Sequence, residues 1–338
     1  MSTVGAPKQS DFSGSVQIAG PRKQLQPDSA FQRLSHRFGD RLFNAVTFLF
    51  AGGIAALVVI MIIAMAVNSN LAFGKFGIHF LWRSAWNPVT EDFGALPFIY
   101  GTVVSSLLSL IISVPISVGL AIYLVEQAPR KIADPIGFVV QLLAAIPSVV
   151  YGLWAIFVLA PLLRNYVYPA LQSTLGFLPI FKGSQNGLGL LTAGIILSIM
   201  IVPIITAISV DILRAVPNTQ REAALALGAT KWETTSIVLQ NARSGITGAI
   251  ILGLGRAIGE TMAVAMLIGN RAEVAISLFA PSTTIAAAIA NEFTDATSEI
   301  WRQSLIEIGL ILFVITFIIN SLARILVWSV ARGYGKAV

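Results

Sequence analysis

The side chains best suited to chemistry lie in an apolar run near the C-terminal third of the chain. Arg256 and Glu260 stand four residues apart within GAIILGLGRAIGETMAVAMLIGN. That spacing places both on one helix face, and a charge at the centre of a membrane helix costs about 2.5–3.5 kcal/mol. An arginine there offers a planar fork of donors for a tetrahedral oxyanion, with Glu260 holding and tempering the guanidinium. The alternative is a structural ion pair that ties this helix to a neighbour.

A second apolar run, IPSVVYGLW, carries hydroxyl groups beside a proline. Pro147 interrupts a helix there, and Ser148 and Tyr151 lie close to the interruption. Broken helices at membrane depth normally line a cavity, although a proline also produces simple packing kinks. We therefore predict that Ser148, Tyr151, Arg256 and Glu260 line one solute path.

Other chemistries are disfavoured by what the sequence lacks. Cysteine is absent and the only histidines are His36 and His79, so we expect no metal site. No G-x-x-x-x-G-K-[ST] motif occurs, so the chain has no P-loop for ATP. We also find no nucleophile constellation, and we predict a protein that is not an enzyme and holds no cofactor of its own.

The segment DILRAVPNTQREAALALGATKWETTSIVLQNAR is the most informative polar stretch. Thr219 stands three residues before Glu222, and Thr230 three before Glu233, which predicts two helices that open with capping boxes. Gly228 lies between them and suits the left-handed position that ends a helix. The first helix is rich in Ala and Leu and has no partner within the segment, which indicates that another protein covers it.

The elements that carry these residues are predicted to be membrane helices. The chain is 56% hydrophobic and 11% charged, whereas a soluble domain carries about 25% charged residues. Backbone groups in lipid must bond internally, so the spans are helices and the fold class is all-α. Charge-free apolar runs predict four spans, near 43–67, 98–123, 136–161 and 188–210, and two apolar runs with internal charges predict a fifth near 246–268 and a sixth near 304–328. Residues 165–181 are predicted to form an external loop, with or without a short helix.

Lysine and arginine positions predict the orientation. Fifteen of the 22 lie in the tail, loops and end on one side of the predicted membrane, six lie on the other, and Arg256 lies within a span. The positive-inside rule places both termini in the cytoplasm. We expect the net charge of +6 to meet membrane lipids rather than nucleic acid.

The polar segment resembles the EAA loop of ABC importer permeases. The resemblance rests on Glu222-Ala223-Ala224, on Gly228 and on the later Ile237 and Leu239, although Gln240 stands where the pattern has a proline. It implies a type I, MetI-like fold in a bacterial inner membrane. It also implies that the helix containing Glu222, Ala223 and Ala224 docks on an ATPase subunit.

The strings GLGRAIGETMAV and IPSVVYGLW resemble the phosphate permeases within that family. This implies an ATP-driven phosphate importer that also contains a second permease subunit, two ATPase subunits and a periplasmic phosphate-binding protein. ATP and magnesium would then be bound by the ATPases. Two alternatives stay open at this point. One is a permease for another oxyanion, such as sulfate, molybdate or tungstate, and the other is a stand-alone secondary transporter or channel.

The predicted organisation has four parts. They are a cytoplasmic tail (1–41), a first span with a periplasmic segment (42–97), a permease domain (98–328, with its coupling loop at 211–245) and a cytoplasmic C-terminus (329–338).

The orientation is testable by labelling, since engineered cysteines are the only thiols in this chain. An impermeant thiol reagent added to intact spheroplasts should label Ala85→Cys and Asp295→Cys. It should leave Arg130→Cys and Ala229→Cys unlabelled until the membrane is opened. The reverse pattern would overturn the predicted topology.

Overall fold

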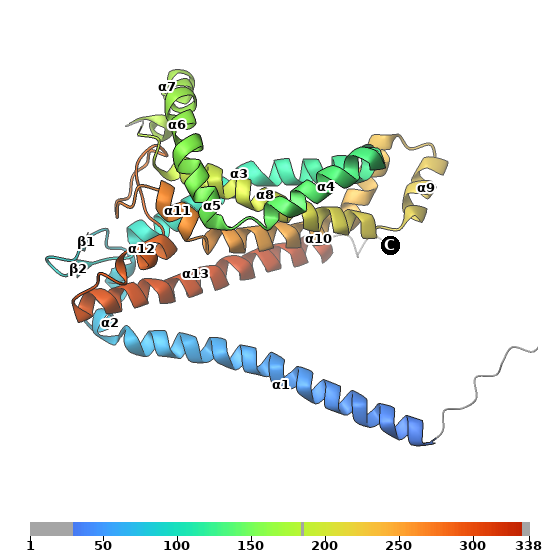
Figure 1. Cartoon of the computed structure of the whole chain (residues 1–338), viewed down its shortest axis with the longest axis horizontal. Coiled ribbons are helices and arrows are strands. Elements are labelled where there is room, and N and C mark those ends of the chain that lie inside the picture. Colours follow the sequence, from blue (N-terminus) through green and yellow to red (C-terminus); the bar gives the residue numbers. More distant parts are fainter. Residues whose placement is uncertain (1–29, 184–185, 333–338) are drawn as a thin grey trace, which may run out of the picture. The chain divides into compact units, whose positions relative to one another are not determined.

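The computed structural model describes the backbone of residues 30–183 and 186–332 and the side chains within 42–183 and 186–325 (Figure 1). Six helical segments are long and apolar enough to cross a membrane, which confirms the predicted number. They are Leu42–Asn68, Leu96–Gln127, Ser148–Leu175, Leu190–Ala215, Lys231–Ile258 and Glu299–Ile325. The described chain falls into two compact units that divide between Ile60 and Met61. Residues 1–29 and 333–338, which belong to the predicted cytoplasmic tail and C-terminus, lie outside the described residues.

The first unit contains most of helix α1 (Ala30–Asn68). This helix begins within the predicted tail, because no proline interrupts residues 30–41. All described side chains from 42 to 60 are exposed, and most of them are apolar. A helix of this kind needs lipid or another protein around it.

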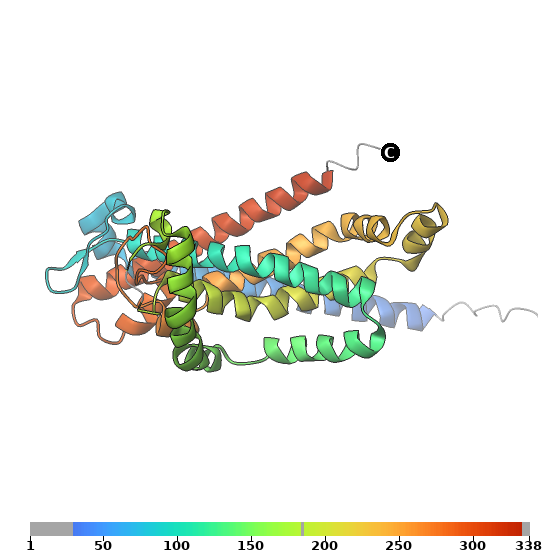
Figure 2. The same cartoon turned by 90° about the horizontal axis from the view of Figure 1, so that it is seen from above.

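The second unit is built around three helices that pack side by side, α3 (Leu96–Ile122), α8 (Leu190–Ala215) and α10 (Lys231–Ile258) (Figure 2). Helix α8 lies at the centre, with 67% of its most apolar window buried. The buried face of α3 is rich in small hydroxyl residues, which let helix backbones approach closely. These residues are Thr102, Ser105, Ser106, Ser109, Ser113 and Ser117.

The third span lies later in the chain than predicted. Helix α4 (Arg130–Ala144) runs beside α8, and the chain breaks at 145–147 before α5 (Ser148–Trp154) starts (Figure 1). The break follows from Pro147, which has no N–H to donate and cannot continue α4. The spanning helix is therefore 148–175 rather than 136–161.

Within the predicted external loop at 165–181, the helix that the prediction allowed is present and continues the third helical segment to Leu175. Two π-helical turns, Ala155–Leu159 and Leu163–Val167, alternate with α6 (Ala160–Leu162) and α7 (Tyr168–Leu175). Each π turn comes just before a proline-containing turn, where the hydrogen-bonding register changes. That change accommodates the missing N–H groups without ending the helix.

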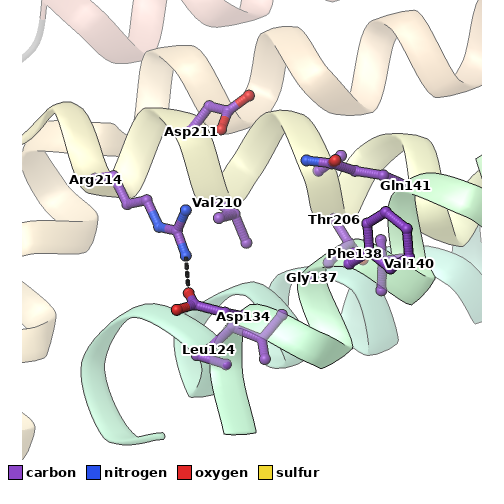
Figure 3. Close-up of a pocket in the computed structure, with 12 residues that line it drawn as sticks. Leu124, Asp134, Gly137, Phe138, Val140, Gln141, Thr206, Val210, Asp211 and Arg214 are labelled. Atoms are coloured by element: carbon purple, nitrogen blue, oxygen red, sulfur yellow. Dashed lines mark ion pairs between the residues drawn. The ribbon is translucent and has the colours of Figure 1, made fainter. Parts of the chain in front are cut away.

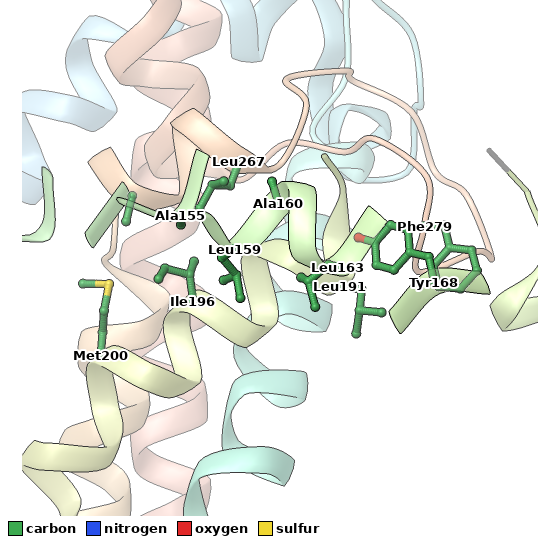
Figure 4. Close-up of a cluster of buried hydrophobic side chains, with 11 residues drawn as sticks. Ala155, Leu159, Ala160, Leu163, Tyr168, Leu191, Ile196, Met200, Leu267 and Phe279 are labelled. Atoms are coloured by element: carbon green, nitrogen blue, oxygen red, sulfur yellow. The ribbon is translucent and has the colours of Figure 1, made fainter. Parts of the chain in front are cut away.

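A buried apolar cluster fixes this third span against α8 and the loop before α12 (Figure 4). The rings of Tyr168 and Phe279 stack with centroids 4.4 Å apart, and the Tyr168 hydroxyl lies 2.6 Å from Thr192 Oγ1. The rest of the cluster is aliphatic or thioether: Ala155, Leu159, Ala160, Leu163, Leu191, Ile196, Met200, Ala263 and Leu267.

The fifth span and the helix before it are one continuous element. Helix α10 starts at Lys231, directly after the glycine turn, and ends at Ile258. Residues 259–261 then leave the helix, and the short α11 (Met262–Leu267) follows. The predicted span over 246–268 therefore contains a helix break of its own.

Small elements close the other end of the second unit. They are α2 (Asn70–Phe76), a 3-10 turn (Gly77–Leu81), β1 (Trp86–Asn87), β2 (Asp92–Phe93) and α12 (Ile285–Glu292), and they lie beside the long helix α13 (Glu299–Arg332). Strands β1 and β2 pair antiparallel. The indole N–H groups of Trp86 and Trp301 both donate to Glu292 Oε2, at 2.8 and 3.1 Å. These residues, predicted to lie outside the membrane, thus hold the hairpin, α12 and α13 together.

Close packing of α3 against the loop before α12 predicts a strong substitution effect at Gly101. A Cβ atom there would lie 1.9 Å from the Thr283 carbonyl oxygen, so Gly101→Ala should destabilise the protein by about 1–3 kcal/mol. Gly119→Ala, on the same helix with nothing within 4 Å, is the matched control. Thermal unfolding in detergent should show a lower Tm for Gly101→Ala only, and equal Tm values would contradict the packing.

Candidate functional site

Two helix breaks meet in the second unit. Helix α4 gives way to α5 at 145–147, and α10 gives way to α11 at 259–261. The short helices α5 and α11 are packed tightly, because a Cβ atom on Gly152 would lie 2.7 Å from Met266 Sδ and 3.0 Å from Ala263 Cα. The two motifs predicted to line one path, which are about a hundred positions apart in sequence, are therefore neighbours in space.

Tyr151 spans the first break. Its hydroxyl donates to the Leu143 carbonyl oxygen at 2.9 Å, which satisfies an acceptor in the last turn of α4. Ser148 is half-buried and lies one turn before Gly152, on the α5 face that meets α11. Tyr151 and Ser148 thus both lie at the first break, with Ser148 beside the contact between α5 and α11.

Arg256 and Glu260 occupy different environments. Arg256 is exposed on the last turn of α10, whereas Glu260 is 8% exposed and lies in the break. The Glu260 carboxylate accepts from the Ala263 N–H at 3.4 Å, at the start of α11. No ion pair joins Arg256 to Glu260 within the described residues.

The prediction that these two side chains share a helix face is therefore wrong. The spacing of four places them together only in an uninterrupted helix, and α10 ends at Ile258. The guanidinium is left without a carboxylate partner from this pair. A charge so placed in a spanning helix is costly unless it meets water, a ligand or a partner chain.

The polar segment forms the predicted helix, turn and helix. Helix α9 (Asn218–Ala226) is followed by Gly228 at φ +86°, the left-handed position expected of it. The capping box of Thr230 and Glu233 is confirmed at the start of α10. The box predicted for Thr219 is wrong, because Pro217 takes the N-cap position and Thr219 lies inside α9.

The surface of this segment is strongly apolar. Leu227 is 90% exposed and Trp232 is 74% exposed, while Leu225 is 53% exposed. Within the motif Glu222 and Ala223 are exposed, and Ala224 is buried. Exposed apolar groups of this size indicate a protein partner.

Sequence reasoning missed two polar contacts near the ends of the spans. Arg221 and Glu126 form an ion pair at 2.8 Å although 95 residues separate them. Arg214 and Asp134 form a second pair at 3.9 Å, beside a cavity of about 170 Å³ between α4 and α8 (Figure 3). The only local signal for the first pair is an arginine directly before the Glu222-Ala223-Ala224 motif.

Six spans, an exposed apolar helix in a loop and a charge at a helix break define a membrane transport subunit. The chain belongs to the family of binding-protein-dependent transport system inner membrane components, whose pattern matches residues 113–332. It is accordingly a multi-pass inner-membrane permease of the ABC transporter class, not itself an enzyme. This family works with ATPase and substrate-binding-protein partners.

Named relatives give a finer comparison. A phosphate transport system permease protein PstC from Mesorhizobium japonicum is 46% identical over 91% of this chain and 95% of the relative. The PstC of Pasteurella multocida is 43% identical over 93% and 99%, and that of Haemophilus influenzae 42% over 88% and 96%. A chain of an inward-facing MetNI methionine ABC transporter aligns at a TM-score of 0.48 with 18% identity, over 70% of this chain and 94% of that chain. The family assignment rests on the sequence matches.

The turn at Gly228 predicts a graded series of substitutions. Nothing lies within 4 Å of a Cβ atom at this position, so only the positive φ opposes a side chain. An L-residue in this conformation costs about 1–2 kcal/mol, and asparagine tolerates it better than alanine or valine. Coupled transport by reconstituted complexes should fall in the order Asn, Ala, Val, with Gly228→Asn as the matched control. Equal activity of all three would show that the turn geometry is not needed.

Proposed function

We propose that this chain is a PstC-like permease subunit of an ATP-driven inorganic phosphate importer. Its partners in this proposal are a PstA-like second permease, two PstB-like ATPase subunits and a PstS-like periplasmic binding protein. The proposal is supported by relatives of that name at 42–46% identity over most of both chains. Such matches favour phosphate over sulfate, molybdate or tungstate, and an ABC permease family disfavours a stand-alone transporter or channel.

The observation that carries the proposed path is the exposed Arg256 at the meeting of two helix breaks. Its guanidinium offers paired donors that match the oxygens of a phosphate ion. The Ser148 hydroxyl adds a donor from the opposite break, and Tyr151 adds one when its O–H releases the Leu143 carbonyl oxygen. Glu260 lies nearby as a buried carboxylate, so it opposes tight retention of an anion and favours its release. Discontinuous helices of this kind commonly form substrate sites near the membrane midplane.

The proposed coupling runs along α10. This helix of 28 residues begins beside the glycine turn, ends at Ile258 and carries Arg256 in its last turn, so its whole length is about 42 Å at 1.5 Å per residue. In the proposal, α9 with Glu222, Ala223 and Ala224 docks on an ATPase subunit on the cytoplasmic side. ATP and magnesium bind to the ATPases, and their closure moves α9 and thereby the end of α10. Both termini of this chain are then cytoplasmic.

The substrate path is tested at Arg256. Arg256→Gln should lower phosphate uptake by about tenfold or more, because a hydrogen bond to a charged group is worth about 1.5–3 kcal/mol. Membrane abundance should stay normal, since the described structure shows no ion pair between Arg256 and Glu260. Arg256→Lys should rescue poorly, because an ammonium lacks the planar fork. Arg130→Gln, at the start of α4, is the control that should leave uptake unchanged.

The role of Glu260 is separated in the same assay. Glu260→Gln keeps an oxygen to accept from Ala263 N–H, so the subunit should assemble while phosphate release slows. Glu260→Ala also removes this cap and should lose about 1 kcal/mol of stability. Normal uptake per assembled complex in Arg256→Gln would refute the path through Arg256. It would leave the two residues with structural roles only.

A further inference from the structure

Arg221 makes several hydrogen bonds in the first half of α9 (Asn218–Ala226), the docking helix of the proposed function. Its Nη2 and Nε atoms donate to the Glu126 carboxylate, at 2.8 and 3.2 Å. Its Nη1 donates to the Val216 carbonyl oxygen at 2.7 Å, and its Nη2 to that of Leu213 at 2.9 Å. The Arg221 side chain is 16% exposed and that of Glu126 is 9% exposed.

These partners belong to the cytoplasmic ends of two different spans. Leu213 and Val216 supply carbonyl groups at the end of α8, where a helix leaves acceptors without intrahelical donors. A cation in that position also suits the helix dipole. Glu126 lies at the end of the second span, in the π-helical turn Tyr123–Gln127 that follows α3. A π turn adds a residue to the helical turn and so changes the direction of the side chains it carries.

A second ion pair near the same ends gives the contrast. Arg214 and Asp134 are 3.9 Å apart and 52% and 69% exposed, so solvent screens their attraction. The distance between the charged groups of Arg221 and Glu126 is shorter, at 2.8 Å. Both side chains are largely buried, and two donor atoms of Arg221 contact the carboxylate. Charge-assisted pairs with this geometry are directional and stronger. Of these two pairs, only Arg221–Glu126 has the geometry to fix the orientation of α9 relative to the second span.

The chain itself joins α9 to its neighbours on two sides only. It continues from α8 through Val216 and Pro217, and into α10 through Gly228. The second span has no such connection, because Glu126 lies 95 residues from Arg221. Next to the pair, a cavity of about 560 Å³ lined by Gln127, Leu225 and Trp232 separates the elements. The ion pair therefore bridges α9 and the second span where side-chain packing leaves a gap.

We propose that Arg221 is a positioning residue that fixes the docking helix to Glu126 at the end of the second span. Displacement of α9 is then passed to the second span as well as to the fourth and fifth. This inference rests on the proposed function, because it requires α9 to receive movement from an ATPase. In this inference Arg221, which directly precedes Glu222-Ala223-Ala224, positions α9 and does not itself contact the ATPase.

The test separates the ion pair with Glu126 from the hydrogen bonds that Arg221 donates to the carbonyl groups at the end of α8. Glu126→Gln removes the charge that holds the second span but leaves Arg221 bonded to the α8 carbonyl groups. Arg221→Gln removes both, and Arg214→Gln is the matched control from the exposed pair. In reconstituted complexes, phosphate transported per ATP hydrolysed should fall about fivefold or more in Glu126→Gln, and further in Arg221→Gln. Arg214→Gln should keep the wild-type ratio.

A cross-link distinguishes this inference from the proposed function. Leu227→Cys adds a single thiol to the exposed end of the docking segment, and a bifunctional reagent should join it to the ATPase in wild-type and Arg221→Gln backgrounds. No cross-link in the wild-type background would refute the docking itself. A cross-link together with an unchanged transport ratio in both Glu126→Gln and Arg221→Gln would refute the role of Arg221 alone. The role of Arg221 would also be refuted if uptake falls only in proportion to the amount of the subunit in the membrane. If Arg221→Gln fails to assemble, the transport ratio of Glu126→Gln is the result that tests the role.

Discussion

Backbone groups that leave a helix inside a membrane must find hydrogen bonds within the protein, and lipid supplies none. Two helices in this chain break close to each other, and side chains near the breaks bond to the helix ends. Tyr151 donates to the Leu143 carbonyl oxygen at one break, and Glu260 accepts from the Ala263 N–H at the other. Tight packing at Gly152 keeps the two breaks adjacent. The exposed position of Arg256 depends on this arrangement, because the helix that carries it ends two residues later.

Helix α10 connects the region of the helix breaks with the glycine turn at Gly228. It is continuous from the glycine turn at one end to the turn that carries Arg256 at the other. A long helix transmits a displacement without needing a chain of side-chain contacts. Small hydroxyl residues on α3 bring the backbones of the central helices close, so that α10 moves against a compact neighbour. In the proposed function, coupling and substrate contact are therefore properties of one element.

Sequence patterns predicted the parts of this structure that depend on local chemistry. Apolar runs gave the number of spans, and Gly228 with Thr230 and Glu233 gave the turn and its cap. The third span was misplaced because hydropathy does not register a proline break, and because π turns let helix continue past later prolines. The pairing of Arg256 with Glu260 was wrong because a four-residue spacing has meaning only in an unbroken helix.

Contacts between distant segments were beyond the sequence. Nothing near Glu126 indicates that its partner lies 95 residues away, and a π turn that directs its side chain has no sequence signature. The meeting of α5 with α11 likewise depends on the tertiary packing of Gly152 against Ala263. The family resemblance predicted roles for Arg256 and for Glu222-Ala223-Ala224. That one continuous helix, α10, connects the two regions became clear only from the structure.

The glycine turn has a thermodynamic consequence for assembly. Its left-handed backbone has open space around it, so its shape comes from the chain itself, with the Thr230–Glu233 cap and the Arg221 bonds on either side. A segment that is ordered before it meets its partner has already lost its conformational entropy in folding. Association with a partner then lacks this cost, and the exposed Leu227 and Trp232 contribute their full burial to affinity.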